Sequence, residues 1–205
     1  MSEGGSHPIY FLYDILNEYD GVRVLSFSRY FYRPQSPIDE RQVFQVSRDE
    51  ISLDWLSFQM DKLQDGWELA LNSLVVDHRN RAFHIPMIDF YGRDGSIFFD
   101  AYFQEIFGKK YADRIYVYDS GRSFHSYFAS LLSPKAWIEF MGSLLLLNLP
   151  GCVPVVDSRW VGHRLHAGYS ALRWSCKTAY YLKFPEFVPL VEIFKNHAGV
   201  RDSKK

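Results

Sequence analysis

The sequence predicts a mixed α/β protein of the α+β type, in which antiparallel strand pairs alternate with helices. Short β-branched or aromatic runs at 85–88, 115–118 and 153–156 each end in a turn residue, which is typical of buried strands. Between these runs lie segments whose apolar residues recur at helical spacing. The 205 residues are 47% hydrophobic and 18% aromatic, which is ample for one core, so we predict a single domain over 1–205.

The first part of the chain predicts a layer of helices and strands over residues 1–80. An Asp-Gly turn separates the first helix from the first strand, and two prolines before residue 40 indicate a loop. Ser47 followed by Glu50 has the pattern of a capping box in front of an amphipathic helix. After a loose terminus over 1–8, the expected elements are a helix over 9–19, strands over 22–27 and 43–46, and a helix over 51–63.

Residues 81–198 predict the core of the fold, followed by a frayed tail over 199–205. The order strand, helix, strand, strand, helix, strand is the split βαβ arrangement, an antiparallel sheet with helices on one face and an open face for a ligand. Ser133 is expected to cap a helix with Pro134 in its first turn. The expected elements are strands over 69–76 and 82–90, a helix over 96–107, strands over 114–119 and 124–131, a helix over 135–147, a strand over 153–156, a helix over 158–167, strands over 171–175 and 179–184, and a helix over 188–197.

Composition and charge exclude several classes of protein. The net charge of −1 excludes a bulk electrostatic affinity for nucleic acid, although it is compatible with a local basic patch. Cys152 and Cys176 lack the paired spacing of a zinc site or a disulfide framework, so we expect two small buried side chains in a reducing compartment. The longest apolar stretch, 144–149, is far shorter than the roughly 20 residues of a membrane span, and no targeting segment is evident. We therefore expect a cytoplasmic protein that makes no membrane contact.

Two acidic residues at strand ends form the first candidate site. Asp89 closes one strand-like run, and Asp157 directly follows another. If the two strands are neighbours, the carboxylates can share Mg²⁺ or Mn²⁺, hard cations that prefer oxygen ligands and accompany nucleotide phosphates. Each residue alone has a structural alternative, a turn or a helix N-cap, and capping is favoured for Asp157 because a helix is predicted to follow it. As a pair placed on either side of a basic segment, the two acids favour a metal site.

The segment 120–125, Ser-Gly-Arg-Ser-Phe-His, forms the second candidate site. A Ser-Gly turn exposes backbone N–H groups, Arg122 offers a bidentate fork, and His125 begins the returning strand. These donors suit a triphosphate. The structural alternative is an ordinary hairpin turn with a histidine in the core.

Further basic and aromatic residues follow Asp157. Arg159, His163 and His166 recur at i, i+4 and i+7, which places them on one basic face of a helix. Trp174 has two interpretations, a platform on which a base stacks or a packed core residue, and the core is the more common environment.

The order acid, Ser-Gly-Arg-x-x-His, acid resembles the three motifs of the archaeo-eukaryotic primase superfamily, which contains primases and primase-polymerases. The segment 172–178, with its basic residue, Ser and Lys-Thr pair, resembles the strand that follows the third motif in that family. The resemblance spans about 83–184 and implies an RRM-like antiparallel sheet core with flanking helices. It implies metal binding and catalysis by Asp89 and Asp157, with His125 as a further catalytic residue. The nucleotide-binding residues that it implies are Ser120, Arg122, Ser123, His125, Arg159, His163, His166, Arg173 and Lys177.

The first motif departs from the family pattern at Tyr91. The family usually carries two acids there, spaced one residue apart, and a two-metal mechanism needs bridging carboxylates for ions roughly 3.5–4 Å apart. Asp89 and Asp157 alone support one divalent cation, Mg²⁺ or Mn²⁺. Asp94 and Asp119 are the two alternatives for the missing ligand.

Three functional interpretations follow from the resemblance and this departure. The first is a primase/polymerase-like nucleotidyltransferase of reduced activity, with nucleoside triphosphates, a DNA or RNA template and further proteins as partners. The second is a catalytically degenerate nucleotide- or nucleic-acid-binding module of a larger bacterial or mobile-element system. The third is a purely structural protein with neither nucleotide binding nor a basic groove.

Overall fold

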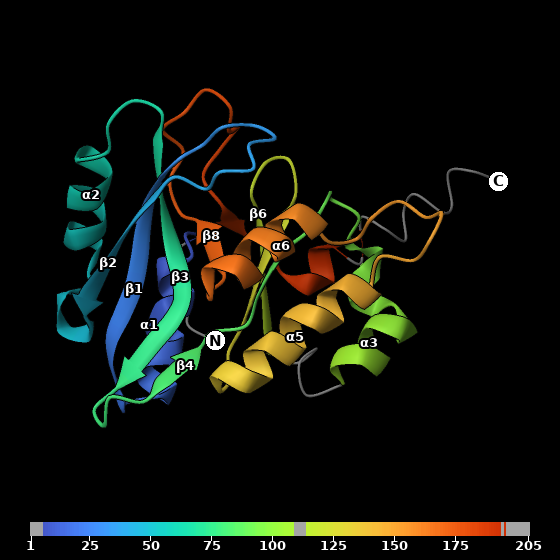
Figure 1. Ribbon diagram of the computed structural model, residues 1–205, viewed down its shortest axis with the longest axis horizontal. Coiled ribbons are helices and arrows are strands. Elements are labelled where there is room, and N and C mark those ends of the chain that lie inside the picture. Colours follow the sequence, from blue (N-terminus) through green and yellow to red (C-terminus); the bar gives the residue numbers. More distant parts are fainter. Residues whose placement is uncertain (1–5, 109–113, 194, 196–205) are drawn as a thin grey trace.

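The computed structural model describes residues 6–108, 114–193 and 195. Two antiparallel sheets and several helices make up this part of the chain, which confirms the predicted α+β class (Figure 1). In Figure 1 the helix α2 lies outermost beside the first sheet, and α3 lies at the opposite end of the molecule. No helix in the described ranges is long and apolar enough to cross a membrane.

The first sheet is built mainly from the N-terminal part of the chain. Its strand order is β2-β1-β3-β4, and β8 pairs with β3 beside this path. Two of its strands, β4 and β8, come from beyond residue 80. The elements of this part are α1 (Ile9–Glu18), β1 (Val22–Phe31), β2 (Arg41–Ser47), η1 (Arg48–Glu50), α2 (Leu53–Asp61), β3 (Trp67–Asp77), β4 (Ala82–His84) and β8 (Ala171–Arg173).

The second sheet has the order β5-β7-β6-β9. An isolated antiparallel bridge between Phe90 and Val156 adds a further position beside β5. The resulting spatial order, fourth, first, third and second, is that of the expected split βαβ unit with its fourth strand reduced to one bridge. The elements are β5 (Met87–Asp89), η2 (Gly95–Phe99), α3 (Ala101–Phe107), β6 (Ile115–Asp119), β7 (Phe124–Phe128), α5 (Pro134–Leu146), α6 (Ser158–Ala167) and β9 (Glu186–Phe187).

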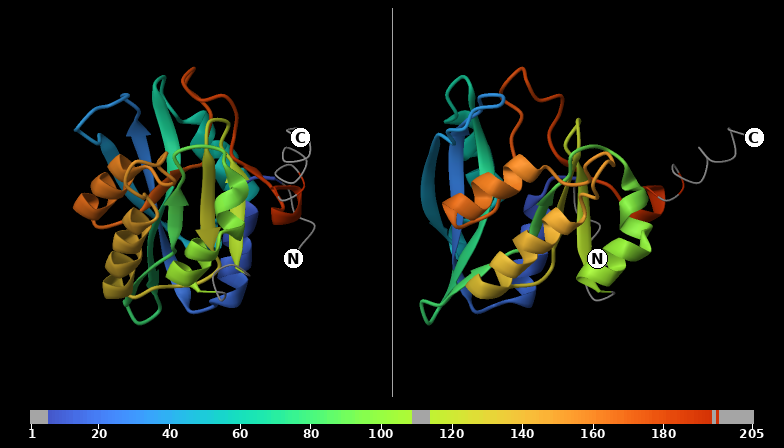
Figure 2. Two further views of the ribbon diagram at one scale, coloured as in Figure 1. Left: turned by 90° about the vertical axis from the view of Figure 1, so that its right-hand side faces the viewer. Right: turned by 45° about the vertical axis from the view of Figure 1, so that its right-hand side comes forward.

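Alternation along the second sheet determines what each face contacts. Ile88 and Val117 point to one face and pack into the core formed with α3 and α5. Met87 and Tyr118 point to the other face, where they join the core shared with α1 and the first sheet. The helices α5 and α6 lie side by side in both views of Figure 2. Asp89, between Ile88 and Phe90, therefore belongs to the face that looks toward the first sheet.

Three predicted strands differ from the observed structure. The run 82–90 divides at Pro86, so that β4 stays in the first sheet and β5 enters the second. Proline lacks the N–H group that would continue a strand ladder. The predicted strand 153–156 forms only the single bridge, because Asn148 Oδ1 accepts the N–H groups of Val155 and Val156 at 2.8 and 2.9 Å. The segment 179–184 is also not a strand and consists of turns and irregular chain.

The predicted capping motifs are present, but not all of them cap the helix that was expected to follow. Ser133 caps α5, with Pro134 in its first turn, as expected. The capping box of Ser47 and Glu50 is present, but it lies at the start of the 3₁₀ turn η1. Ser52 caps α2 instead. The predicted helix 96–107 is divided at Asp100, whose side chain accepts the N–H of Tyr102 and begins α3.

The termini and the cysteines complete the comparison with the predictions. His7 Nε2 forms a hydrogen bond with the carbonyl of Trp174 at 2.8 Å, so the predicted loose terminus 1–8 is anchored from that residue onward. Of the predicted helix 188–197, residues 190–193 and 195 are helical and 188–189 are irregular chain; residues 194, 196 and 197, the tail 199–205 and residues 1–5 lie outside the described residues. Both cysteines are free, and the expectation of burial is wrong for Cys152, which is exposed.

Candidate active site

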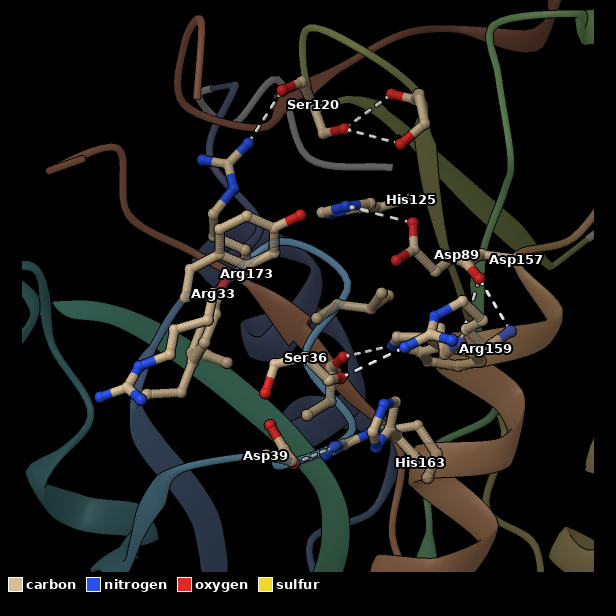
Figure 3. A pocket seen from close by; sticks show the side chains of 18 of the residues that line it. Arg33, Ser36, Asp39, Asp89, Ser120, His125, Asp157, Arg159, His163 and Arg173 are labelled. Atoms are coloured by element: carbon tan, nitrogen blue, oxygen red, sulfur yellow. Dashed lines mark hydrogen bonds and ion pairs between the residues drawn. The ribbon is translucent and has the colours of Figure 1, made fainter. Parts of the chain in front are cut away.

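The second sheet brings Asp89, His125 and Asp157 into one row. Asp89 lies directly opposite His125 in the pairing of β5 with β7. On the other side, the bridge of Phe90 with Val156 places Asp157 opposite Asp89, and the Asp157 N–H donates to the Asp89 carbonyl at 3.1 Å. Directly opposed residues of antiparallel strands project from the same face. Figure 3 shows the three side chains together on one wall of a cleft.

The Asp89 carboxyl group is held in an environment that opposes its ionisation. Burial is the larger cause and the charge of Asp157 the second, and together they raise the pKa of Asp89 to about 8. The charges of Arg173 and Arg164 and a hydrogen bond from Ser123 act in the opposite direction without cancelling the shift. A bound cation would reverse this balance, because it favours the ionised carboxylate.

His125 is a neutral imidazole at physiological pH. Its Nε2 lies 3.6 Å from Asp89 Oδ1, and its buried Nδ1 has no hydrogen-bond partner in the described part of the chain. Burial, with a smaller contribution from Arg173, lowers the pKa of His125 to about 3. The residue therefore offers a triphosphate a hydrogen bond and no positive charge.

Asp157 caps a helix and also lines the cleft. Its Oδ1 accepts the N–H groups of Arg159 and Trp160 at 2.9 and 3.1 Å, which caps α6. The residue also lines the cleft, and its Oδ2 makes no hydrogen bond to the residues that the structure describes. One oxygen thus serves the helix while the other is available to a ligand.

The cleft between the two sheets is strongly basic although the whole chain is not. Its volume is about 430 Å³, and its lining includes residues of β1, the loop 32–40, α6, β8 and the second sheet. Three aspartates, Asp39, Asp89 and Asp157, face a larger number of cations. These are the six arginines Arg33, Arg41, Arg122, Arg159, Arg164 and Arg173. A chain with a net charge of −1 thereby acquires the local basic patch that its composition left open.

Comparison with known protein families places this geometry in a family. The model of the AEP-like family, described as archaeo-eukaryotic primase 1D-like, matches residues 47–186, which is more than half of the chain. The chain belongs to this archaeo-eukaryotic primase family. Neither the curated proteins nor the solved structures contain a significant match.

In this primase-family chain, the 120–125 segment forms a tight turn at the mouth of the cleft. Ser120 Oγ donates to the Ser123 carbonyl at 2.8 Å, and Gly121, with φ at 99°, donates its N–H to Asp119 Oδ1 at 2.9 Å. That amide is therefore already engaged. Arg122 is exposed and lines the cleft, with its guanidinium 4.1 Å from the centroid of the Tyr180 ring.

Arg173 lines the cleft and connects three segments of chain around it, and its contact with a nucleotide stays a prediction. The side chain is buried, and its Nη2 donates to the Ser120 carbonyl at 2.8 Å. Its Nη1 donates to the carbonyls of Ser175 and, at 3.1 Å, Lys183. With its fork engaged in this way, Arg173 acts on the site through its charge, which opposes the raised pKa of Asp89.

The basic residues after Asp157 divide into those inside and those outside the cleft. Arg159 and His163 line it, whereas His166 is exposed on the next turn of α6 and does not. Lys177 also lies outside with an exposed side chain, and its backbone N–H donates to Glu68 Oε1 at 2.9 Å. The expected nucleotide contacts of His166 and Lys177 are not supported by their positions. Trp174 is fully buried, which agrees with the core interpretation.

The position of the second acid in the primase family's first motif is occupied by an exposed phenol. Tyr91 is 60% exposed and lines the cleft, as expected two residues after Asp89 on an extended chain. The two alternative ligands do not line the cleft. Asp94 caps η2, and Asp119 pairs with Arg93 at 2.6 Å. Within the described residues, no group of three or more His, Cys, Asp or Glu side chains is arranged to hold a metal ion.

Sequence reasoning missed the wall of the cleft that faces the family motifs. Tyr30 of β1 and Tyr32 just after that strand line it, together with Asp39, Arg41 and Arg164. The only local signal was the cluster of charged residues just after the proline-containing loop. Arg164 carried no signal, because it breaks the spacing of the basic helix face.

Proposed function

We propose that the cleft binds a nucleoside triphosphate together with one divalent cation, and that the protein is a primase-like nucleotidyltransferase of reduced activity. The observation that carries this proposal is the row of His125, Asp89 and Asp157 facing a cleft lined by six arginines. Oxygen ligands for a hard cation and basic groups for phosphates lie on the same surface, as metal-assisted nucleotide chemistry requires.

The donor set fits Mg²⁺ or Mn²⁺. Asp89 and the free Oδ2 of Asp157 lie on opposed residues, and the charge of Asp157 contributes to the raised pKa of Asp89. Mg²⁺ is commonly held by one or two carboxylates, with substrate phosphates and water completing its coordination. When bound, such an ion would neutralise charge on the phosphates during transfer. The two carboxylates support one ion of this kind.

The triphosphate would lie on the side of the cleft formed by Arg122 and Arg159. Arg122 is exposed and stacks on Tyr180, so its planar fork stays accessible to a phosphate. Arg159 and His163 extend the basic surface along α6, and His125 supplies a neutral donor beside Asp89. Arg173 would hold the 120–125 turn in position through its bond to the Ser120 carbonyl.

A second candidate function is a degenerate binding module within a larger bacterial or mobile-element system. Nucleotidyl transfer joins a 3′-oxygen to the α-phosphorus and releases pyrophosphate, and polymerases clamp both oxygens with paired ions. Tyr91 cannot supply the second bridging carboxylate, and this observation favours nucleotide or nucleic-acid binding without turnover. A DNA or RNA template and further proteins would be partners in either case.

Titration with a nucleoside triphosphate and Mn²⁺ tests the placement of the nucleotide. We expect Arg122→Ala to weaken binding about tenfold or more, because one charge-assisted contact contributes roughly 1.5–3 kcal/mol. Arg79→Ala is the matched control, since this exposed arginine lies outside the cleft and its loss should leave affinity unchanged. Equal affinities of wild type and Arg122→Ala, at equal melting temperatures, would reject the placement.

A further inference from the structure

A compact group of charges lies at the end of the cleft away from Ser120. Asp39 lies on the loop between β1 and β2, and its Oδ1 and Oδ2 accept the N–H of Arg41 Nε at 2.8 and 2.7 Å. Asp39 also pairs with Nη2 of Arg164, a residue of α6. Figure 3 shows Asp39 near His163 at this end of the cleft.

The group is unbalanced in charge and in hydrogen bonding. Two guanidinium groups share one carboxylate, which leaves a local excess of one positive charge. The Arg164 side chain is 2% exposed, and its Nε and Nη1 have no hydrogen-bond partner among the described residues. Burial and the neighbouring Arg41 both lower the pKa of Arg164. Buried donors without partners are unfavourable, so a second anion would be stabilised here.

Both arginines also lie against aromatic rings. Arg41 lies 4.3 Å above the centroid of the Tyr30 ring and donates to Ser28 Oγ at 3.0 Å. Arg164 lies 5.6 Å from the centroid of Tyr169. Arginine stacked on an aromatic ring presents a preorganised fork, which suits planar recognition of a phosphate.

We infer that Arg41 and Arg164 form a second phosphate-binding subsite, which the carboxylate of Asp39 occupies while no ligand is bound. Once Asp39 withdraws, the two guanidinium groups present two positive charges and their free N–H donors to a phosphate group. A phosphodiester of a nucleic-acid strand and a phosphate of a second nucleotide share this chemistry. The inference rests on the proposed function, because it places this ligand beside the nucleotide held near Asp89.

The loop that carries Asp39 is tied to the proposed triphosphate side of the cleft. Arg159 Nη2 donates to the carbonyls of Gln35 and Ser36 at 3.2 and 3.3 Å. Withdrawal of Asp39 would require this loop to shift, and the shift would expose Arg164 Nε and Nη1 to the incoming phosphate. A triphosphate that recruits the Arg159 guanidinium would weaken the same tie, so the two ligands are expected to favour each other.

Substitution of Asp39 gives a test that loss of folding cannot imitate. Binding of a fluorescent single-stranded oligonucleotide and of a nucleoside triphosphate with Mn²⁺ is measured for wild type, Asp39→Asn, Arg164→Gln and the double variant. We expect Asp39→Asn to tighten oligonucleotide binding about fivefold or more, because the competing charge is removed. Arg164→Gln should lower the salt dependence of binding by about 0.7 in log–log slope, the value for one phosphate contact with a single strand. In the double variant, the tighter oligonucleotide binding of Asp39→Asn should be lost.

The two ligands identify the source of the phosphate. If the changes appear with the oligonucleotide alone, the subsite binds a strand; if they appear with the triphosphate alone, it binds a second nucleotide. Arg41→Gln provides an independent variant should Arg164→Gln fail to fold. Unchanged affinity in Asp39→Asn for both ligands, with an unchanged salt slope in the folded arginine variant, would overturn the inference. Triphosphate binding that fails in wild type would instead contradict the proposed function.

Discussion

At the scale of single residues, Asp89 shows how the fold prepares a carboxyl group for a cation. Burial and the opposed Asp157 raise its pKa to about 8, whereas an isolated aspartate ionises near 3.8. The neighbouring His125 is shifted the other way, to a pKa of about 3, and stays neutral. Near neutral pH, Asp89 therefore holds a proton and His125 does not. Binding of a cation should displace the proton from Asp89.

The raised pKa of Asp89 makes stability depend on pH in a defined direction. Its contribution to the free energy of unfolding is fully present below pH 3.8 and is lost as pH rises through about 8. Without metal, Asp89→Asn should therefore match wild type near pH 4 and exceed it above pH 8. We expect a difference of roughly 1–3 kcal/mol at the higher pH, because the carboxyl group is partly accessible to water.

Denaturant unfolding in the presence of a chelator, at pH 4.5 and pH 8.5, measures this difference. Comparison at equal pH removes most of the contribution of His125, whose effect on stability is present above pH 6.5 and lost as pH falls toward 3. The expectation fails if the difference between wild type and Asp89→Asn is the same at both pH values.

Tyr91 determines how much nucleotidyl transfer the site can support. A phenol is neutral at pH 7 and cannot replace the charge of a metal-bridging carboxylate. We expect weak or Mn²⁺-dependent transfer by wild type and an increase of about tenfold or more in Tyr91→Asp, the effect of one added charge-assisted contact. Primer-extension and priming assays with Mg²⁺ and with Mn²⁺ measure both.

Asp94→Ala is the control for the Tyr91 experiment. Asp94 caps η2 and does not line the cleft, so its loss should leave transfer unchanged. Rapid Mg²⁺-dependent polymerisation by wild type that disappears in Asp94→Ala would show that Asp94 supplies the missing ligand, and the interpretation of a weakened site would then be wrong.

At the scale of elements, local patterns predicted helices and hairpins well. They failed to predict strands correctly where a side chain took the backbone hydrogen bonds or where a proline interrupted the strand. The helix α1 and the hairpin of β6 and β7 follow directly from apolar periodicity and turn residues. The run 153–156 has the composition of a strand, yet Asn148 takes over two of its N–H groups. Residues that act on a segment from outside it cannot be found by reading that segment.

The candidate site was predictable to the extent that its residues lie at strand ends. Asp89, His125 and Asp157 each follow or begin a short apolar run, so a shared sheet brings them together. The pairing of Asp39 with Arg164 joins residues 125 apart in sequence, and no local pattern connects them. The positions of His166 and Lys177 outside the cleft have the same origin, since helix length and loop path decide which basic residues line it.

At the scale of the whole molecule, the cleft is a product of the way the two sheets face each other. The primase family match begins at residue 47, whereas Tyr30, Asp39 and Arg41 come from before that point and form the opposite wall. The first sheet thus supplies both core packing for the second and a chemical surface of its own. That the two sheets form one domain stays a prediction, consistent with the core that they share.

Binding of a nucleoside triphosphate with and without Mn²⁺, in wild type and Asp89→Asn, tests the shared metal and nucleotide site most directly. We expect Mn²⁺ to raise the affinity of wild type about tenfold or more, because the ion links the carboxylates to the phosphates. The increase should grow as pH rises toward 8, where Asp89 loses its proton, and should vanish in Asp89→Asn. An equal increase in Asp89→Asn, or none in wild type, would contradict a cation held by Asp89 and Asp157.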